Sequence, residues 1–192
     1  MNNDISEKTK NYELTVLLPA LNEEESIGRI IKEIKNVLSK KNINYCILVS
    51  DNGSSDNTIK IAKDHNVLIN HVRDKGYGSN LKTSIKDVKS KYLIFFDSDG
   101  SYDPNEIVPM YEEIKLSNID MVYGNRLIKQ EKNSMPFLNR YLGTPVLSKL
   151  ISIFFGLKVK DCNSGMRMLK LQSFEKVNFF LQRNGICFRN VH

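Results

Sequence analysis

Residues 92–104 read YLIFFDSDGSYDP, and this stretch is the strongest indicator of the fold class. It opens with five consecutive apolar residues, Tyr92 to Phe96, which are typical of a strand buried on both faces. The strand runs directly into Asp97-Ser98-Asp99. Asp103 followed by Pro104 then predicts a helix start, because the carboxylate can cap the first N–H groups and proline suits the first turn.

The same strand-to-helix pattern recurs over the first two thirds of the chain. Short apolar runs predict further strands at residues 14–18, 45–49, 67–69 and 121–123. Apolar residues at helical spacing predict helices around residues 27–38, 59–62, 79–88 and 107–114. Alternating strands and helices indicate an α/β fold, with a mostly parallel sheet covered by helices on both faces, as in a Rossmann-like nucleotide-binding domain.

Composition bounds the class of protein. The chain has 192 residues, of which 41% are apolar and 26% charged, as in a soluble globular domain. No run of eighteen apolar residues predicts a spanning helix, and residues 1–12 are expected to form a polar tail without a secretory signal. The three cysteines have no metal-site spacing and are expected to be free thiols. The chain has neither a Walker A loop nor a GxGxxG after the first strand, which argues against a P-loop or dinucleotide site.

The positive charge is concentrated in residues 129–170. This segment carries eight basic and two acidic residues, so it accounts for the whole net charge of +6. It suits either an anionic partner or a solvated basic face. Residues 142–155 also form a wide apolar stripe, which fits a core helix or, alternatively, a helix lying on a membrane.

Polar residues follow each predicted strand. Because the carboxyl ends of parallel strands meet at one edge of a sheet, these segments are expected to form a ligand site together. They are residues 19–23, 50–56, 73–78, 97–99 and 124–126.

Asp97 and Asp99 suggest a metal at this edge. In an extended chain their side chains would point to the same side, and two carboxylates so close repel each other unless a cation lies between them. Mg²⁺ or Mn²⁺ would suit these oxygen ligands together with a substrate phosphate.

In order, these motifs resemble family-two glycosyltransferases with the GT-A fold, and most of all the polyprenyl-phosphate glycosyltransferases such as dolichyl-phosphate mannosyltransferase. The segments that carry the resemblance are LLPALNEEESI, VSDNGSSDNT, DKGYGSNLKTSI, FFDSDGSYDP, YGNRL and NRYLGTPVLSKL with VKDCNSGMRMLK. The resemblance covers residues 14–170. Two residues depart from it: Asn52 stands where Asp is usual, and Ser101 stands where relatives often have a third metal ligand.

The resemblance implies a role for each matching residue. Pro19, Ala20, Glu23 and Asp51 would hold the base and ribose of a nucleotide sugar, with Lys75, Gly76 and Ser98 also near the donor. Asp97 and Asp99 would bind the metal and diphosphate, and Arg126 and Arg140, with Thr144, would grip the acceptor phosphate. Asp99, Arg126 and Arg140 would be the residues most directly involved in catalysis.

The resemblance also implies an activity and a location. We expect a domain over residues 13–181, incomplete at its C-terminal end, and an atypical tail at 182–192. It would transfer a sugar from a UDP- or GDP-linked donor to a polyprenyl phosphate, with inversion, at the cytoplasmic face of the membrane. No nucleic-acid partner is expected, and the oligomeric state is not predicted. The alternatives are transfer to a glycan hydroxyl, for which Asp103 could be the base, and an inactive truncated fragment that binds nucleotide sugars.

Overall fold

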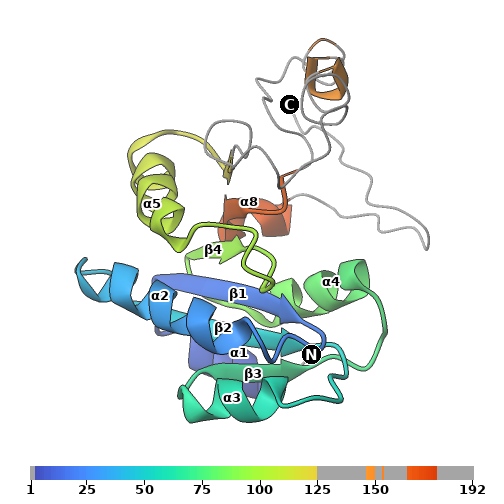
Figure 1. Ribbon diagram of the computed structural model, residues 1–192. Coiled ribbons are helices and arrows are strands. Elements are labelled where there is room, and N and C mark those ends of the chain that lie inside the picture. The colour runs from blue at the N-terminus through green and yellow to red at the C-terminus, as the bar shows by residue number, and fades with distance from the viewer. Residues whose placement is uncertain (1–2, 125–145, 150–152, 154–163, 177–192) are drawn as a thin grey trace.

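The computed structural model describes residues 3–124, 146–149, 153 and 164–176. Its centre is a six-stranded sheet in the order β3-β2-β1-β4-β6-β5 (Figure 1). The strands are β1 Leu14–Ala20, β2 Tyr45–Asp51, β3 Leu68–His71, β4 Tyr92–Phe95, β5 Met121–Tyr123 and β6 Arg167–Lys170. The helices are α1 Asn3–Thr9, α2 Ile27–Ser39, α3 Thr58–Asp64, α4 Tyr77–Asp87, η1 Pro104–Glu106, α5 Ile107–Leu116 and α8 Leu171–Lys176.

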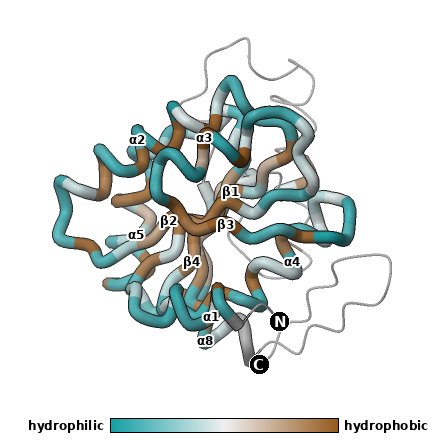
Figure 2. Tube along the Cα trace, turned by 90° about the horizontal axis from the view of Figure 1, so that it is seen from below, coloured by the Kyte–Doolittle hydropathy of each residue, from teal (hydrophilic) through white to brown (hydrophobic). Residues whose placement is uncertain are grey.

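Strand β1 is the middle of the parallel part of the sheet. It pairs in parallel with β2 on one side and β4 on the other, and all seven of its residues are buried. Its side chains alternate between two cores: Val16 and Leu18 pack with α2, α3 and α5, whereas Leu17 packs with α1 and α4. Figure 2 shows the apolar strands at the centre and hydrophilic stretches along the helices around them. The predicted α/β architecture, with helices on both faces, is therefore confirmed.

The helix start predicted at Asp103 is confirmed. The Asp103 carboxylate accepts a hydrogen bond from the N–H of Asn105, with Pro104 in the first turn of η1. Asp56 accepts in the same way from the N–H of Thr58, the first residue of α3. Each cap fixes where the chain turns away from the carboxyl edge of the sheet.

Strand β6 was missed from the sequence. It runs antiparallel to both β4 and β5, so the sheet is mostly rather than wholly parallel. Its four residues read RMLK, and only Met168 and Leu169 are fully buried. So short a pattern, with a basic residue at each end, gives little strand signal, and the pairing on both sides decides its structure.

The N-terminal segment also differs from the polar tail that we expected. Residues 3–9 form α1, and Ile5 is only 1% exposed because it packs in the core formed by Leu17, Leu48 and α4. Ser6 Oγ donates to the carbonyl of Asp87 at 2.9 Å. One apolar residue among the seven of α1 carries no periodicity, so only the tertiary contact reveals the helix.

We expect Ile5→Ala to lower the free energy of unfolding by about 2–5 kcal/mol, because it removes a fully buried aliphatic side chain. Urea unfolding followed by circular dichroism measures the loss. Lys8→Ala is the control, since Lys8 lies on the exposed side of α1, paired only with Asp4, and should cost less than about 1 kcal/mol. Equal stability of the two variants would mean that α1 does not pack on the sheet.

Candidate functional site

The loop after β1 and the loop after β2 are joined by reciprocal hydrogen bonds. Asn22 N–H donates to Ser54 Oγ at 3.0 Å, and Asn22 Oδ1 accepts from the N–H of Ser55 at 2.8 Å. Asn22 adopts a positive φ of 57°, a conformation that asparagine tolerates better than most residues. In addition, Glu23 N–H donates to Thr58 Oγ1 at 2.7 Å. The two motifs that we identified separately are thus one structural unit.

Glu24 and Asp56 complete this junction. Glu24 N–H donates to Asp56 Oδ2 at 3.1 Å, and Glu24 Oε2 accepts from the N–H of Asn57 at 2.9 Å. Slight desolvation of Asp56 would raise its pKa, but hydrogen bonds from Thr58 and from the Glu24 N–H outweigh it and lower the pKa. The carboxylate is therefore ionised near neutral pH, and the junction carries negative charge.

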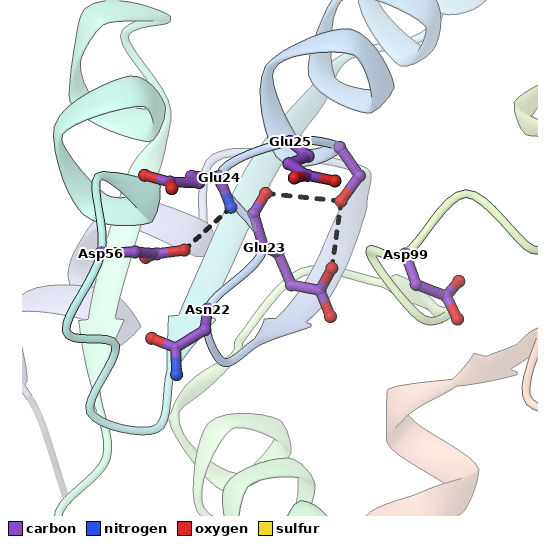
Figure 3. A pocket seen from close by; sticks show the side chains of 7 residues that line it. Asn22, Glu23, Glu24, Glu25, Asp56 and Asp99 are labelled. Atoms are coloured by element: carbon purple, nitrogen blue, oxygen red, sulfur yellow. Dashed lines mark hydrogen bonds between the residues drawn. The ribbon is translucent and has the colours of Figure 1, made fainter.

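A pocket of about 240 Å³ lies beside this junction (Figure 3). It is lined by polar and acidic residues from three loops: Asn22, Glu23, Glu24, Glu25, Ser26, Asp56 and Asp99. Ser26 connects two of these loops, because its Oγ donates to the carbonyl of Ser98 at 2.6 Å and to Glu23 Oε2 at 3.1 Å. A pocket with this lining attracts cations and repels an unaccompanied anion.

Asp51 lies at the end of β2 and is almost fully buried. Its carboxylate accepts hydrogen bonds from the N–H groups of Gly53 at 3.2 Å and Ser54 at 3.0 Å, and its Oδ2 lies 3.2 Å from His71 Nδ1. Burial would raise the pKa of Asp51, but the hydrogen bonds from Ser54, His71 and Gly53 outweigh it and hold the pKa below its usual value. Asp51 is therefore an ionised acceptor at a fixed position.

The Asp97-Ser98-Asp99 segment is a turn, not the extended chain that we expected. Strand β4 ends at Phe95, and Ser98 and Asp99 lie in a turn. Strand alternation therefore does not decide where the two carboxylates point. Ser98, which we expected near the donor, is 1% exposed, and its Oγ donates to the carbonyl of Pro19 at 2.7 Å. Its hydroxyl holds the turn against β1.

The two aspartates have different surroundings. Asp99 is exposed on the pocket side, where its two oxygens accept from the N–H and the Oγ of Ser101, both at 2.8 Å. Asp97 is half-buried beside the hydroxyl of Tyr77. Burial and the hydrogen bond to Asp97 raise the pKa of Tyr77 far above its usual value, so the tyrosine remains a hydrogen-bond donor.

The segment before β6 lies against Asp97. Gly165 N–H donates to the Tyr102 hydroxyl at 2.6 Å. A Cβ atom on Gly165 would lie 2.7 Å from that hydroxyl and 3.0 Å from Asp97 Oδ2. Only glycine fits this approach without displacing a neighbour.

The remaining predicted residues fall into three groups. Pro19 and Ala20 are buried at the end of β1, and the carbonyl of Ala20 accepts from the N–H of Asn52 at 3.0 Å, so both help to hold the loops. Lys75 and Gly76 are exposed before α4. Arg126, Arg140 and Thr144 lie outside the described residues. Within the described part of the chain, no group of three or more His, Cys, Asp or Glu side chains could hold a metal alone.

The model of the family described as "Glycosyl transferase family 2" matches residues 15–177. The chain belongs to glycosyltransferase family 2. It is 31% identical to the low-salt glycan biosynthesis hexosyltransferase Agl6 of Haloferax volcanii, over 86% of this chain and 40% of Agl6. It is 26% identical to the dolichyl-phosphate hexose transferase of the same organism, over 87% of this chain and 70% of that protein.

Solved structures confirm the GT-A fold. Glucosyl-3-phosphoglycerate synthase from Mycobacterium tuberculosis, in complex with Mn²⁺, UDP and phosphoglyceric acid, superimposes with a TM-score of 0.62 at 19% identity. The match covers 88% of this chain and 59% of that one. Mannosyl-3-phosphoglycerate synthase from Rubrobacter xylanophilus gives 0.68 at 17% identity, over 89% and 57%. The chain thus spans 40% of Agl6 and somewhat over half of each of these structures.

Sequence reasoning missed Tyr77, Tyr102 and Gly165 as neighbours of Asp97. Tyr77 lies between Gly76 and Gly78, which directed attention to the backbone and not to the tyrosine side chain. Gly165 lies 68 positions beyond Asp97. No local sequence pattern connects these residues with Asp97. The glycine at position 165, shortly before the basic residue Arg167, was nevertheless a visible clue.

We expect Gly165→Ala to destabilise the protein by about 1–3 kcal/mol, because the added methyl group would collide with Tyr102 and Asp97. Gly78→Ala is the matched control, since nothing lies within 4 Å of its Cβ position and helix α4 favours alanine. Urea unfolding of the two variants provides the comparison. A Gly165→Ala protein as stable as Gly78→Ala would contradict the close approach.

Proposed function

We propose that this chain transfers a sugar from a nucleotide-sugar donor to a polyprenyl phosphate at a membrane surface, with inversion at the anomeric carbon. The observation that carries the proposal is the single carboxyl edge at which the hydrogen-bonded loops after β1 and β2 meet the Asp97–Asp99 turn. Curated relatives point the same way, because one is named as a dolichyl-phosphate hexose transferase and another as an N-acetylglucosaminyltransferase acting with dolichyl phosphate.

The nucleoside would bind over the ends of β1 and β2. Asp51 is ionised and fixed, which suits it to accept hydrogen bonds from a base or ribose. Glu23, in the loop after β1, lines the pocket. The solved neighbour in complex with UDP supports a nucleoside diphosphate of this kind, without deciding between UDP and GDP.

A divalent cation fits the charge at this edge. The pocket is lined by Glu23, Glu24, Glu25, Asp56 and Asp99, so a diphosphate would be repelled unless a cation accompanied it. Asp97 and Asp99 offer hard oxygen ligands, and Mg²⁺ or Mn²⁺ commonly uses one or two carboxylates together with substrate phosphates. When bound, the ion would neutralise charge on the departing diphosphate. The neighbouring structure that contains Mn²⁺ and UDP agrees with this choice of ion.

The acceptor phosphate needs no general base. Its oxygen is already ionised near neutral pH, so it would attack the anomeric carbon directly while the bond from that carbon to the diphosphate oxygen breaks. Arg126, Arg140 and Thr144 would hold the acceptor phosphate, since guanidinium binds phosphate through two parallel hydrogen bonds. Lys75 would lie on the donor side and offset the charge that develops there.

The second candidate is transfer to a glycan hydroxyl, which would require a base such as Asp103. The Asp103 carboxylate already accepts from the backbone N–H and the side-chain Nδ2 of Asn105, at 2.9 and 2.8 Å, where it caps η1. Its role is explained without catalysis. This favours the phosphate acceptor over the hydroxyl.

The membrane part of the proposal rests on exposed apolar side chains near the basic segment. Residues 146–149 are helical, with Val146 and Leu147 50% and 45% exposed, and Ile153 is 67% exposed. Such exposure favours an interfacial helix over the core helix that was the alternative. Among the described residues, no helix is both long and apolar enough to span a bilayer.

We expect Asp99→Ala to abolish turnover and to remove the metal dependence of nucleoside-diphosphate binding. Calorimetry with UDP and GDP, with and without Mn²⁺, measures the binding. Asp103→Asn is the control, because asparagine preserves the cap but cannot serve as a base. It should bind and turn over as wild type does. Metal-dependent binding that persists in Asp99→Ala would refute the metal site, and loss of turnover in Asp103→Asn would support the hydroxyl acceptor.

We expect the full chain to sediment with vesicles containing anionic lipid at low salt and to release as salt rises, because exposed charges are screened. Leu147→Ser should weaken the binding, whereas Leu116→Ser, at an 87% exposed leucine that ends α5, should not. Arg140→Ala should impair transfer to a polyprenyl phosphate more than it impairs donor binding. Vesicle binding that is equal in both leucine variants would count against the interfacial helix.

A further inference from the structure

We propose that Asn52 is a positioning residue that holds residues 72–76 in the conformation that receives the donor's diphosphate. This rests on the proposed function, because it assumes that Lys75 and Gly76 lie at the diphosphate. It concerns one of the two positions at which this chain departs from the motif it resembles, where Asp is usual.

The Asn52 side chain makes three hydrogen bonds to the backbone of one loop. Its Nδ2 donates to the carbonyls of Val72 at 3.2 Å and Asp74 at 2.9 Å, and its Oδ1 accepts from the N–H of Gly76 at 2.8 Å. The residue is only 6% exposed, so these contacts are largely shielded from water. An amide can donate twice and accept at once, whereas an ionised carboxylate can only accept.

The amide continues the pairing of β2 with β3 beyond the end of the sheet. The regular register ends at Asp51 opposite His71, followed by one bond from Val72 N–H to the Asp51 carbonyl at 2.9 Å. Beyond that point, the Asn52 side chain forms the hydrogen bonds to residues 72–76 that the backbone of a paired strand would otherwise form. It therefore determines the path of the chain as far as Gly76.

The fixed point at Gly76 is where α4 begins. Gly76 has a φ of 110°, which strains any other residue, and its carbonyl accepts from the N–H of Asn80 at 2.9 Å. Lys75 precedes it on the exposed side, and Tyr77, which faces Asp97, follows it. Asn52 thus links the strand end that carries Asp51 to the loop that carries Lys75.

The body of α4 is anchored independently. Asn80 Nδ2 donates to the carbonyl of Ser50 at 2.9 Å, and Ser50 Oγ hydrogen bonds with both Asn80 and Ser84. Loss of the Asn52 amide should therefore release residues 72–76 without detaching the helix or unfolding the domain. This makes the proposal accessible to substitution.

The test measures binding to Asn52→Asp and Asn52→Ser in the full chain by calorimetry. The ligands are UDP and GDP with Mn²⁺, and the nucleosides uridine and guanosine. Both variants should lose about tenfold or more in affinity for the diphosphate that wild type binds, and much less for its nucleoside. Asn44→Asp is the matched control, because it removes an amide donor to the Asn11 carbonyl at the start of β2 and should change neither affinity.

A double-mutant cycle with Lys75→Ala tests whether Asn52 acts through the loop. If it does, Asn52→Ser should cost much less affinity in the Lys75→Ala background than in wild type. Hydrogen exchange at residues 72–76 should quicken in Asn52→Ser, while β1 exchanges as in wild type, which would show that the fold is intact.

Three outcomes would overturn the inference. Wild-type affinity in Asn52→Ser would mean that any loss in Asn52→Asp comes from its added charge. If the losses of affinity caused by Asn52→Ser and Lys75→Ala simply add in the double variant, Asn52 does not act through the loop that carries Lys75. A weakened Lys75→Ala beside an unaffected Asn52→Ser would leave the proposed donor site standing without the positioning role. Failure of wild type to bind either diphosphate would instead refute the proposed function, and the inference with it.

Discussion

Side-chain hydrogen bonds between loops at the carboxyl edge of the sheet are the constraint on which the candidate site depends. Parallel strands are connected by helices, so the loops that meet at this edge are far apart in sequence and share no backbone ladder. Asn22 and Ser55, which are 33 residues apart, hold the first two loops together, and Asn52 does the same for the next pair. Without such hydrogen bonds, no backbone pairing would fix the positions of these loops relative to one another.

The same bonds shape the electrostatics of the site. Asp51 and Asp56 are kept ionised by N–H and hydroxyl donors, so they serve as fixed acceptors as well as links between loops. Within the part of the chain that the structure describes, Asp99 accepts hydrogen bonds from Ser101 and stays exposed, which leaves it accessible to a cation. The site thus contains two kinds of negative charge. Asp51 and Asp56 hold the loops in place, whereas Asp99 can bind a ligand.

The order of strands and helices between residues 14 and 123 could be predicted, because most of these elements have a clear apolar period and Asp103 marks the start of η1. The prediction failed where contacts with distant parts of the chain, and not the local sequence pattern, determine the structure. Ile5 is a single apolar residue that docks a whole helix, and β6 is defined by partners on both sides. The motifs identified the right edge of the sheet. The turn at Ser98, however, depends on hydrogen bonds to Pro19 and Ser26, and no spacing rule contains them.

Strand β6 brings a late segment of the chain to the edge of the sheet at which the parallel strands end. It returns antiparallel between β4 and β5, so the segment that leads into it, at Gly165, arrives at the same edge as the ends of the parallel strands. Arg167 begins this strand, lies 5.3 Å from the centre of the Tyr123 ring, and donates from Nε to the Ser164 carbonyl. Its orientation is thereby set by β5 and by the turn that contacts Asp97. A Cβ atom added at Gly165 would lie 3.0 Å from Asp97 Oδ2, so the segment that enters β6 packs closely against the Asp97–Asp99 turn. The pairing of Phe95 with Arg167 holds the same two segments together through the backbone.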